Sequence, residues 1–330
     1  MFINKKFKYF LLILLLIVFG ILIYFSIVTN NYRIAKGILK SEINIEELKR
    51  NLKEEQKFDL EIKLNNNQTY YNEVQDAYFY YIDVEKANTY IDLKLKILSK
   101  EKYKYVVNNE KYDEKKGFFI DFEKPIELII YNDDSYYETM ITFSSLPILN
   151  IKTVHEIPPY YQDTDIEVFS KNYENPNKMY FIESDALMKI RGGISWQYPK
   201  KQYKITLTYG DNKNKLSLLG MKSDEDYILD AMFSDFSKIR TKLSFDIWNE
   251  INSYETDYTE IDVNSEYIEV YINQQYHGLY LLKEFVDWKK LGVNEFTENN
   301  TGIVIKGIEY SDWNQEIYEK DKMSYHVLRI

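Results

Sequence analysis

The sequence predicts an α+β protein in which a transmembrane helix and a small all-β, sandwich-like domain precede a mixed domain. Three observations support this prediction. An uncharged run fills residues 9–28, strand-like alternation fills residues 58–143, and later residues combine strands with a helical stripe. We accordingly expect a membrane anchor at 1–32, a stalk or linker helix at 33–57, a sandwich-like domain at 58–145 and a mixed domain at 146–330.

Composition limits the classes of function. The chain has 330 residues and a net charge of −10, which argues against a nucleic-acid partner, because it carries no excess of basic charge. It contains no cysteine, so disulfides and thiolate metal sites are excluded. Its three histidines, His155, His277 and His326, are scattered, and we predict no metal site built on them.

The apolar run at residues 9–28 follows Lys5, Lys6 and Lys8. About 20 apolar residues span a bilayer as a helix, and a short basic start favours an amino terminus inside. A cleaved signal peptide is the alternative, but the run is long for one and no Ala-x-Ala site follows it. We expect a single-pass cell-membrane protein, with residues 9–28 in the membrane and the bulk of the chain extracytoplasmic.

The next two regions differ in the spacing of their apolar residues. Residues 41–56 place Ile45, Leu48 and Leu52 at helical spacing among charged residues, which indicates a short amphipathic helix. Strand-like segments then follow at residues 58–64, 78–82, 90–97, 127–131 and 139–143, separated by asparagine-rich turns. Several short strands at this spacing are typical of a β-sandwich.

A paired-glycine turn is the most informative stretch of the mixed domain. Strand-like residues 187–190 lead to Arg191, Gly192 and Gly193, and a second strand is expected at 200–207. Glycine permits positive φ and close approach of a ligand to the backbone. With Arg191, Ser195 and the following lysines, such a turn can hold a phosphate chain; the alternative is a plain hairpin with its lysines in solvent.

A helix is predicted after residue 237. Its apolar stripe comprises Phe236, Ile239, Leu243, Ile247 and Ile251. The preceding Asp235 and Ser237 can cap its first amides, and Arg240 lies one turn beyond Ser237. By itself this pattern describes a capped helix that bears a solvated arginine.

Two strands around a turn at residues 273–275 complete the pattern, and Glu284 ends the second of them. A carboxylate on a strand that otherwise looks buried needs a cationic partner or water. A paired surface glutamate is the alternative.

In this order, the pieces resemble the CotH (spore coat protein H) family of atypical kinases from about residue 146 to residue 287. The resemblance rests on the Arg191-Gly192 turn with Pro199-Lys200-Lys201, on Asp235-x-Ser237-x-x-Arg240-x-x-Leu243, and on Asn273 with Gly278-Leu279-Tyr280 and Glu284.

The resemblance implies a divergent kinase-like fold and ATP-dependent phosphorylation of serine or threonine in a protein substrate, with Mg²⁺. Lys201 or Lys200 would contact nucleotide phosphate, and Glu284 would orient that lysine, as lysine–glutamate pairs do in other kinases. Arg191 and Ser195 would line the same pocket. By the same resemblance, Asp235, Ser237 and Arg240 would support it.

The sequence departs from the family pattern in two places. Residues 193–194 are Gly-Ile where the family offers polar side chains. The Asn-x-Asp-like and Trp-Asp-x-Asp-like stretches that the resemblance would assign to catalysis and Mg²⁺ are not found before residue 330. We therefore expect the amino-terminal portion of the domain, assign no catalytic or metal-binding residue, and expect no kinase turnover by this chain alone. A non-catalytic cell-surface binding or adhesion module is the alternative function.

Overall fold

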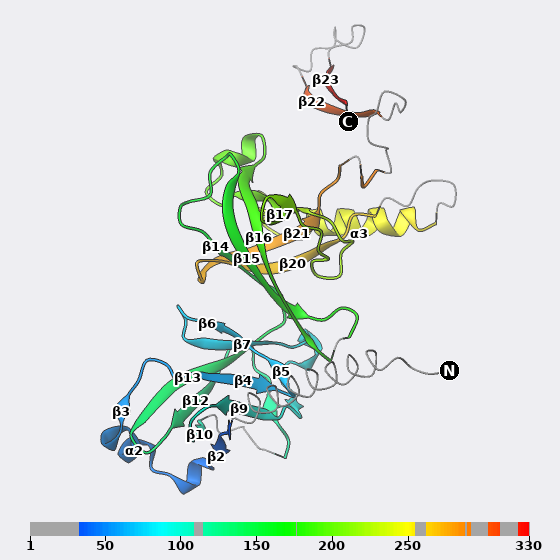
Figure 1. Ribbon diagram of the computed structural model, residues 1–330. Coiled ribbons are helices and arrows are strands. Elements are labelled where there is room, and N and C mark those ends of the chain that lie inside the picture. Colours follow the sequence, from blue (N-terminus) through cyan, green and yellow to red (C-terminus); the bar gives the residue numbers. More distant parts are fainter. Residues whose placement is uncertain are drawn as a thin grey trace, which may run out of the picture. The chain divides into compact units, whose positions relative to one another are not determined.

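The computed structural model describes residues 33–108, 115–175, 177–254, 262–287, 289–291, 303–310 and 323–329. The chain divides into two compact units (Figure 1). Unit 1 is Met1–Leu146 with Asn175–Tyr180, and unit 2 is Pro147–Glu174 with Phe181–Ile330.

Unit 1 is built from β-sheets. A four-stranded sheet has the order β1 (Arg33–Ile34), β9 (Leu95–Ser99), β4 (Leu60–Leu64) and β5 (Asn67–Gln68). A seven-stranded sheet contains β2 (Lys36–Gly37), β10 (Lys104–Val107), β12 (Ile126–Tyr131), β13 (Ser135–Ser144), β7 (Ala77–Tyr81) and β6 (Tyr70–Asn72), with β3 (Lys53–Glu54) paired to β13. A separate pair joins β11 (Phe118–Phe119) to β8 (Tyr90–Ile91), and two 3₁₀ turns cover Lys40–Glu42 and Val84–Lys86.

Alternation along these strands produces the core of unit 1. Ile62 and Ile97 of the four-stranded sheet and Leu128 and Ile130 of the seven-stranded sheet belong to one buried cluster, because alternate strand side chains face the same side. The helix α2 (Ile45–Asn51) adds Leu48 to a second, smaller cluster on the seven-stranded sheet. The predicted amphipathic helix thus exists, and it packs on this sheet.

Unit 2 is a closed barrel of seven strands. The order is β16 (Met179–Arg191), β15 (Gln162–Lys171), β14 (Ile148–Lys152), β20 (Ser265–Ile272), β21 (Gln275–Glu284), β19 (Asp226–Asp230) and β17 (Gln202–Tyr209), and β17 pairs back with β16. The short β18 (Asn212–Lys213) extends β17, and β22 (Ile303–Tyr310) pairs with β23 (Met323–Arg329). Closure removes the free edges that an open sheet exposes.

The register of the barrel places apolar side chains together on one face. Ile205 of β17 lies opposite Met188 of β16 and Tyr227 of β19, and all three are fully buried. Tyr227 in turn lies opposite Glu284 at the end of β21. The register of the paired strands therefore sets the position of the predicted site residues that lie on the barrel.

The helix α3 (Arg240–Asn252) lies beside β20 (Figure 1), and its apolar stripe is exposed. Leu243, Ile247 and Ile251 are 50–58% exposed, and no residue of the helix is buried. Its other side carries Asn249, which exchanges hydrogen bonds with the backbone of Val263, and Phe245, whose ring centroid lies 5.3 Å from the Lys283 ammonium group of β21. The predicted stripe is present, but it does not form the packing face of the helix.

The predicted α+β, kinase-like fold class is wrong. The described residues contain many strands and only two α-helices, α2 and α3, and the mixed domain that we expected is a closed β-barrel. The physical reason is that the glycine-turn strands and the later hairpin pair into one sheet, and a single helix is added at its side.

The predicted membrane anchor at residues 9–28 lies outside the described residues. In the part of the chain that the structure describes, no helix is long and apolar enough to cross a bilayer. We therefore withdraw the expected transmembrane helix, the membrane as a partner and single-pass localisation at the cell membrane.

Candidate functional site

The glycine turn connects β16 to β17 through residues 192–201, and it is wider than the tight turn predicted. Ile194–Gln197 form a 3₁₀ turn after Gly193. Gly192 has φ +114°, and a Cβ there would lie 2.0 Å from the Ser195 hydroxyl oxygen. Glycine is thus required at residue 192, because this backbone conformation and the close Ser195 side chain leave no room for another residue.

Two of the residues predicted to contact phosphate, Arg191 and Lys201, form hydrogen bonds with neighbouring residues. Arg191 donates a hydrogen bond to the Gln202 side-chain oxygen at 3.4 Å, its partner across the β16–β17 pair. Lys201 precedes β17 and folds back to donate to the carbonyl oxygen of Trp196 at 2.8 Å. Because β17 begins only at Gln202, Lys201 lies outside the strand that was expected to start at residue 200.

Lys200 is placed differently from its neighbour. Its half-buried ammonium group donates to the carbonyl oxygen of Leu279 and lies 4.1 Å from the ring centroid of Tyr280. Gly278, at φ +113°, lies directly beside the amine: a Cβ there would lie 3.6 Å from both Cε and Nζ of Lys200, an ordinary contact distance. A cation over an aromatic face is stabilised by the ring quadrupole.

The electrostatics single out Lys200 among the predicted lysines. Burial, followed by the positive charge of Lys238, lowers the pKa of Lys200 to about 8, and the charge of Asp230 acts in the opposite direction. Burial and the Lys200 charge lower the pKa of His277. Among the described residues, no carboxylate forms an ion pair with Lys200, since Asp230 pairs with Lys283 at 2.8 Å. Perturbed titration of this kind is enriched at functional sites.

The loop before α3 is organised by Asp235. Its carboxylate accepts hydrogen bonds from the Ser237 hydroxyl at 2.7 Å, the Ser237 amide at 3.1 Å and the Arg240 amide at 2.8 Å. The bond from Ser237 is the main reason why the pKa of Asp235 lies below its ordinary value. Asp235 thus accepts from the amide of the first residue of α3, although the N-cap residue is Ile239, which makes no side-chain cap hydrogen bond. The Arg240 side chain is 84% exposed at 3.7 Å from this carboxylate.

Glu284 lies away from both predicted lysines. It is 4% exposed, and its oxygens accept from the amides of Lys222 at 3.0 Å and Asn264 at 2.9 Å and from the ammonium group of Lys290. Glu284 follows Leu279 by five residues on β21, which corresponds to roughly 16 Å along a strand. The carboxylate therefore has its own cation, Lys290, and the structure does not bring it to Lys200 or Lys201.

Sequence reasoning missed two members of this cluster, Lys238 and His277. Lys238 occupies an unspecified position within the Asp235-to-Arg240 motif, and His277 immediately precedes Gly278. In the sequence, the only sign of a role for Lys238 is its positive charge between Ser237 and Arg240. The pattern gives no reason to choose it over any other exposed lysine.

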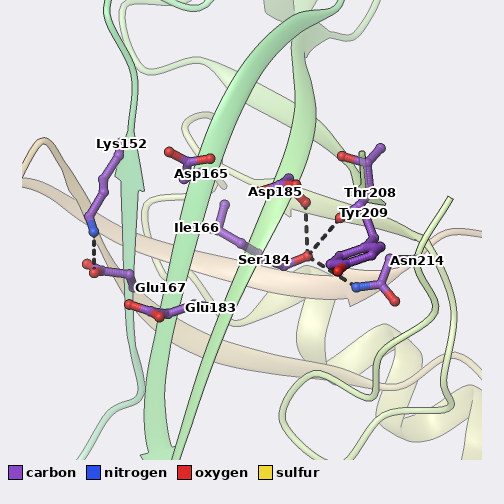
Figure 2. A pocket seen from close by; sticks show the side chains of 10 residues that line it. All are labelled: Lys152, Asp165, Ile166, Glu167, Glu183, Ser184, Asp185, Thr208, Tyr209 and Asn214. Carbon is purple, nitrogen blue, oxygen red and sulfur yellow. Dashed lines mark hydrogen bonds and ion pairs between the residues drawn. The ribbon is translucent and has the colours of Figure 1, made fainter. Parts of the chain in front are cut away.

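A cavity of about 400 Å³ lies elsewhere on unit 2 (Figure 2). Its lining includes Lys152, which pairs with Glu167 at 2.5 Å, and Ser184, which accepts from Asn214 at 3.5 Å. Asp165, Glu183 and Asp185 make the lining acidic. None of the predicted site residues borders it.

The expected Mg²⁺ was tested against the side chains present. Within the described ranges, no group of three or more His, Asp or Glu side chains is placed to bind one metal ion. The described side chains thus offer no ligand set from which a magnesium-dependent step can be derived.

The geometry defines a β-barrel protein with a partly buried, carboxylate-free lysine beside a glycine turn. Residues 188–327 match the family described as CotH kinase protein, which confirms the predicted resemblance over this part of the chain. This stretch includes Lys200, Lys238 and Glu284. No curated protein matches the chain significantly.

Proposed function

We propose that this protein binds the phosphate chain of ATP through Lys200, as the binding step of CotH-type phosphorylation of serine or threonine in a protein. The observation that carries the proposal is the Lys200 ammonium group, which is half-buried, lies over Tyr280 and lacks an acidic partner among the described residues. An ammonium group in this state gains more from a phosphate than a solvated surface lysine does, because its surroundings screen it less.

The neighbouring residues have supporting roles in this proposal. Gly192 and the 3₁₀ turn hold Ser195 and the backbone that leads to Lys200, while Gly278 lies beside the amine. Arg191 lies at the end of β16 and requires only the exchange of one long, 3.4 Å hydrogen bond to meet an anion. Lys201, whose amine donates to the Trp196 carbonyl oxygen, is the second choice for the phosphate contact.

The family activity would transfer a phosphoryl group from ATP to a protein hydroxyl, and Mg²⁺ would supply charge neutralisation. The described residues show neither a metal ligand set nor a carboxylate that accepts the hydroxyl proton beside Lys200. We therefore confine the proposal to nucleotide binding and derive no chemical step from it.

A non-catalytic binding module is the second candidate, and the exposed stripe of α3 favours it. Leu243, Ile247 and Ile251 form a contiguous apolar face, and apolar patches of this kind are frequent at protein interfaces. Binding at such a surface needs no nucleotide.

Calorimetric titration of the full chain with ATP tests the first candidate. We expect Lys200→Ala to weaken ATP binding by roughly tenfold to a hundredfold, the value of one hydrogen bond to a charged group. Lys222→Ala removes an equal charge from an exposed lysine of the same unit and should leave the affinity unchanged. Equal losses in both variants, or no ATP binding by the wild-type chain, would contradict the proposal and favour the binding module.

A further inference from the structure

A second ammonium group, that of Lys238, lies on a loop that packs against the segment of Lys200. The loop that carries Lys238 meets the segment that carries Lys200 through the Tyr198 and Phe233 rings, whose centroids are 5.1 Å apart. The amine of Lys238 returns to the start of this loop and donates to the carbonyl oxygen of Met232 at 2.6 Å. Of the charges that act on Lys200, that of Lys238 has the largest effect. The two amines therefore repel each other, and they lie on segments that meet through the Tyr198 and Phe233 rings.

No carboxylate within the described ranges neutralises this pair. Asp230 is the acidic group that acts on Lys200, but its oxygens accept from Lys283 at 2.8 Å and from the Met232 amide at 2.9 Å. Neither Lys200 nor Lys238 has an ion pair in the part of the chain that the structure describes. Two like charges held in this way destabilise each other, and an anion between them removes that cost.

The position of Lys238 is fixed by its backbone. Its φ is +59°, an uncommon conformation for a residue other than glycine. Its amide donates to the carbonyl of Asp235 at 3.1 Å, and its carbonyl accepts from the Tyr267 hydroxyl at 2.6 Å. A cation that is already held in place loses less conformational entropy when a ligand binds.

We propose that Lys238 is the second cation of the phosphate site, and that it binds the phosphate chain of a nucleoside di- or triphosphate together with Lys200. This inference rests on the proposed function of Lys200. It also gives Asp235 and Ser237 a purpose beyond capping α3, because their hydrogen bonds shape the loop that holds the Lys238 amine. Asp235 and Ser237 are thus positioning residues, whereas Lys238 contacts the ligand.

The test compares sodium tripolyphosphate, ATP and AMP as ligands of the full chain by titration calorimetry. Lys238→Asn removes the charge but tolerates the left-handed backbone, and Lys238→Arg keeps the charge. We expect Lys238→Asn to weaken tripolyphosphate and ATP binding by about tenfold but AMP binding by less than about threefold. Lys238→Arg should bind within about threefold of the wild type, and the control Lys222→Asn should be unchanged.

The outcomes separate this inference from the function on which it rests. If Lys200→Gln weakens ATP binding and Lys238→Asn does not, the two-lysine site is wrong and the Lys200 site stands. If Lys238→Arg loses as much affinity as Lys238→Asn, or AMP loses as much as tripolyphosphate, Lys238 only shapes the loop and the inference fails. If the wild-type chain binds none of the three ligands, both proposals fail. Lys238→Gln replaces Lys238→Asn if the latter does not fold.

Discussion

Raising the pH through the titration of Lys200 should release bound ATP. The pKa of Lys200 is lowered from 10.5 to about 8, first by burial and then by the Lys238 charge. Only the ammonium form attracts phosphate, so affinity falls as the pH rises above this pKa. With a pKa of about 8, the protonated fraction falls roughly 25-fold between pH 7.5 and 9.5, equivalent to about 2 kcal/mol of binding free energy.

The change in ATP affinity reports the titration of Lys200 alone only if the neighbouring groups keep the same charge between pH 7.5 and 9.5. Lys238 reaches it from the loop, Asp230 from β19, and His277 and Tyr280 from β21. Burial raises the pKa of Tyr280 and lowers that of His277, so both are neutral throughout this pH range. Since Lys200 is only about half removed from water, solvent screening makes the 25-fold change an upper figure.

Calorimetric titration with ATP at pH 7.5 and 9.5 measures the effect, and repetition in buffers of different ionisation enthalpy measures the protons taken up. We expect proton uptake on binding near pH 8, because phosphate stabilises the ammonium form. Lys200→Arg stays charged and should bind with little pH dependence. An equal affinity of the wild type at both pH values, or an unchanged pH dependence in Lys200→Gln, would refute the assignment of the titration to Lys200.

Three further predictions concern folding. Glu284→Ala should destabilise the chain by about 3–5 kcal/mol in urea unfolding, because it leaves Lys290 buried without its partner; a loss below about 1 kcal/mol would contradict this pairing. Leu243→Ala on the exposed α3 stripe should change stability by less than about 0.5 kcal/mol, whereas Ile205→Ala in the barrel core should cost about 2–5 kcal/mol; equal effects would place the stripe in a packed interface. Gly192→Ala should cost about 1–3 kcal/mol, and thermal unfolding at the wild-type midpoint would show that the turn adapts freely.

Local pattern predicted many of the strands correctly. The segments expected at residues 127–131 and 139–143 correspond to β12 and β13, because alternation of apolar and polar residues is a local consequence of the pleat. Residues 90–97 were expected as one strand, but they form the separate β8 and β9. The period of a segment does not reveal where a strand is interrupted.

The barrel of unit 2 could not be predicted in the same way. Its closure depends on pairing of β14 with β20, which lie more than a hundred residues apart, and on the return of β17 to β16. Register between distant strands is set by the shape of the whole core, which one sequence does not display. The family resemblance gave the order of the motifs correctly, but the fold class attached to it was wrong.

The helix α3 shows how a correct pattern leads to a wrong orientation. The spacing of Leu243, Ile247 and Ile251 predicted the helix, and the structure confirms it at Arg240–Asn252. A stripe normally marks the face that is buried in the core. Here the side that carries Phe245 and Asn249 faces Lys283 and Val263, so periodicity identified the helix but not which of its sides packs.

The choice between Lys200 and Lys201 depends on a residue far away in the sequence. The resemblance named Lys201 for the phosphate contact, with Lys200 as the alternative, and it did not decide between them. The structure begins β17 at Gln202, two residues after the predicted start, and Lys201 bends back to Trp196. Lys200 donates to the carbonyl oxygen of Leu279 and lies over the Tyr280 ring, both on β21. The surroundings of the candidate phosphate-binding amine are thus supplied by a strand about 80 residues away, and the Pro-Lys-Lys stretch by itself does not reveal that pairing.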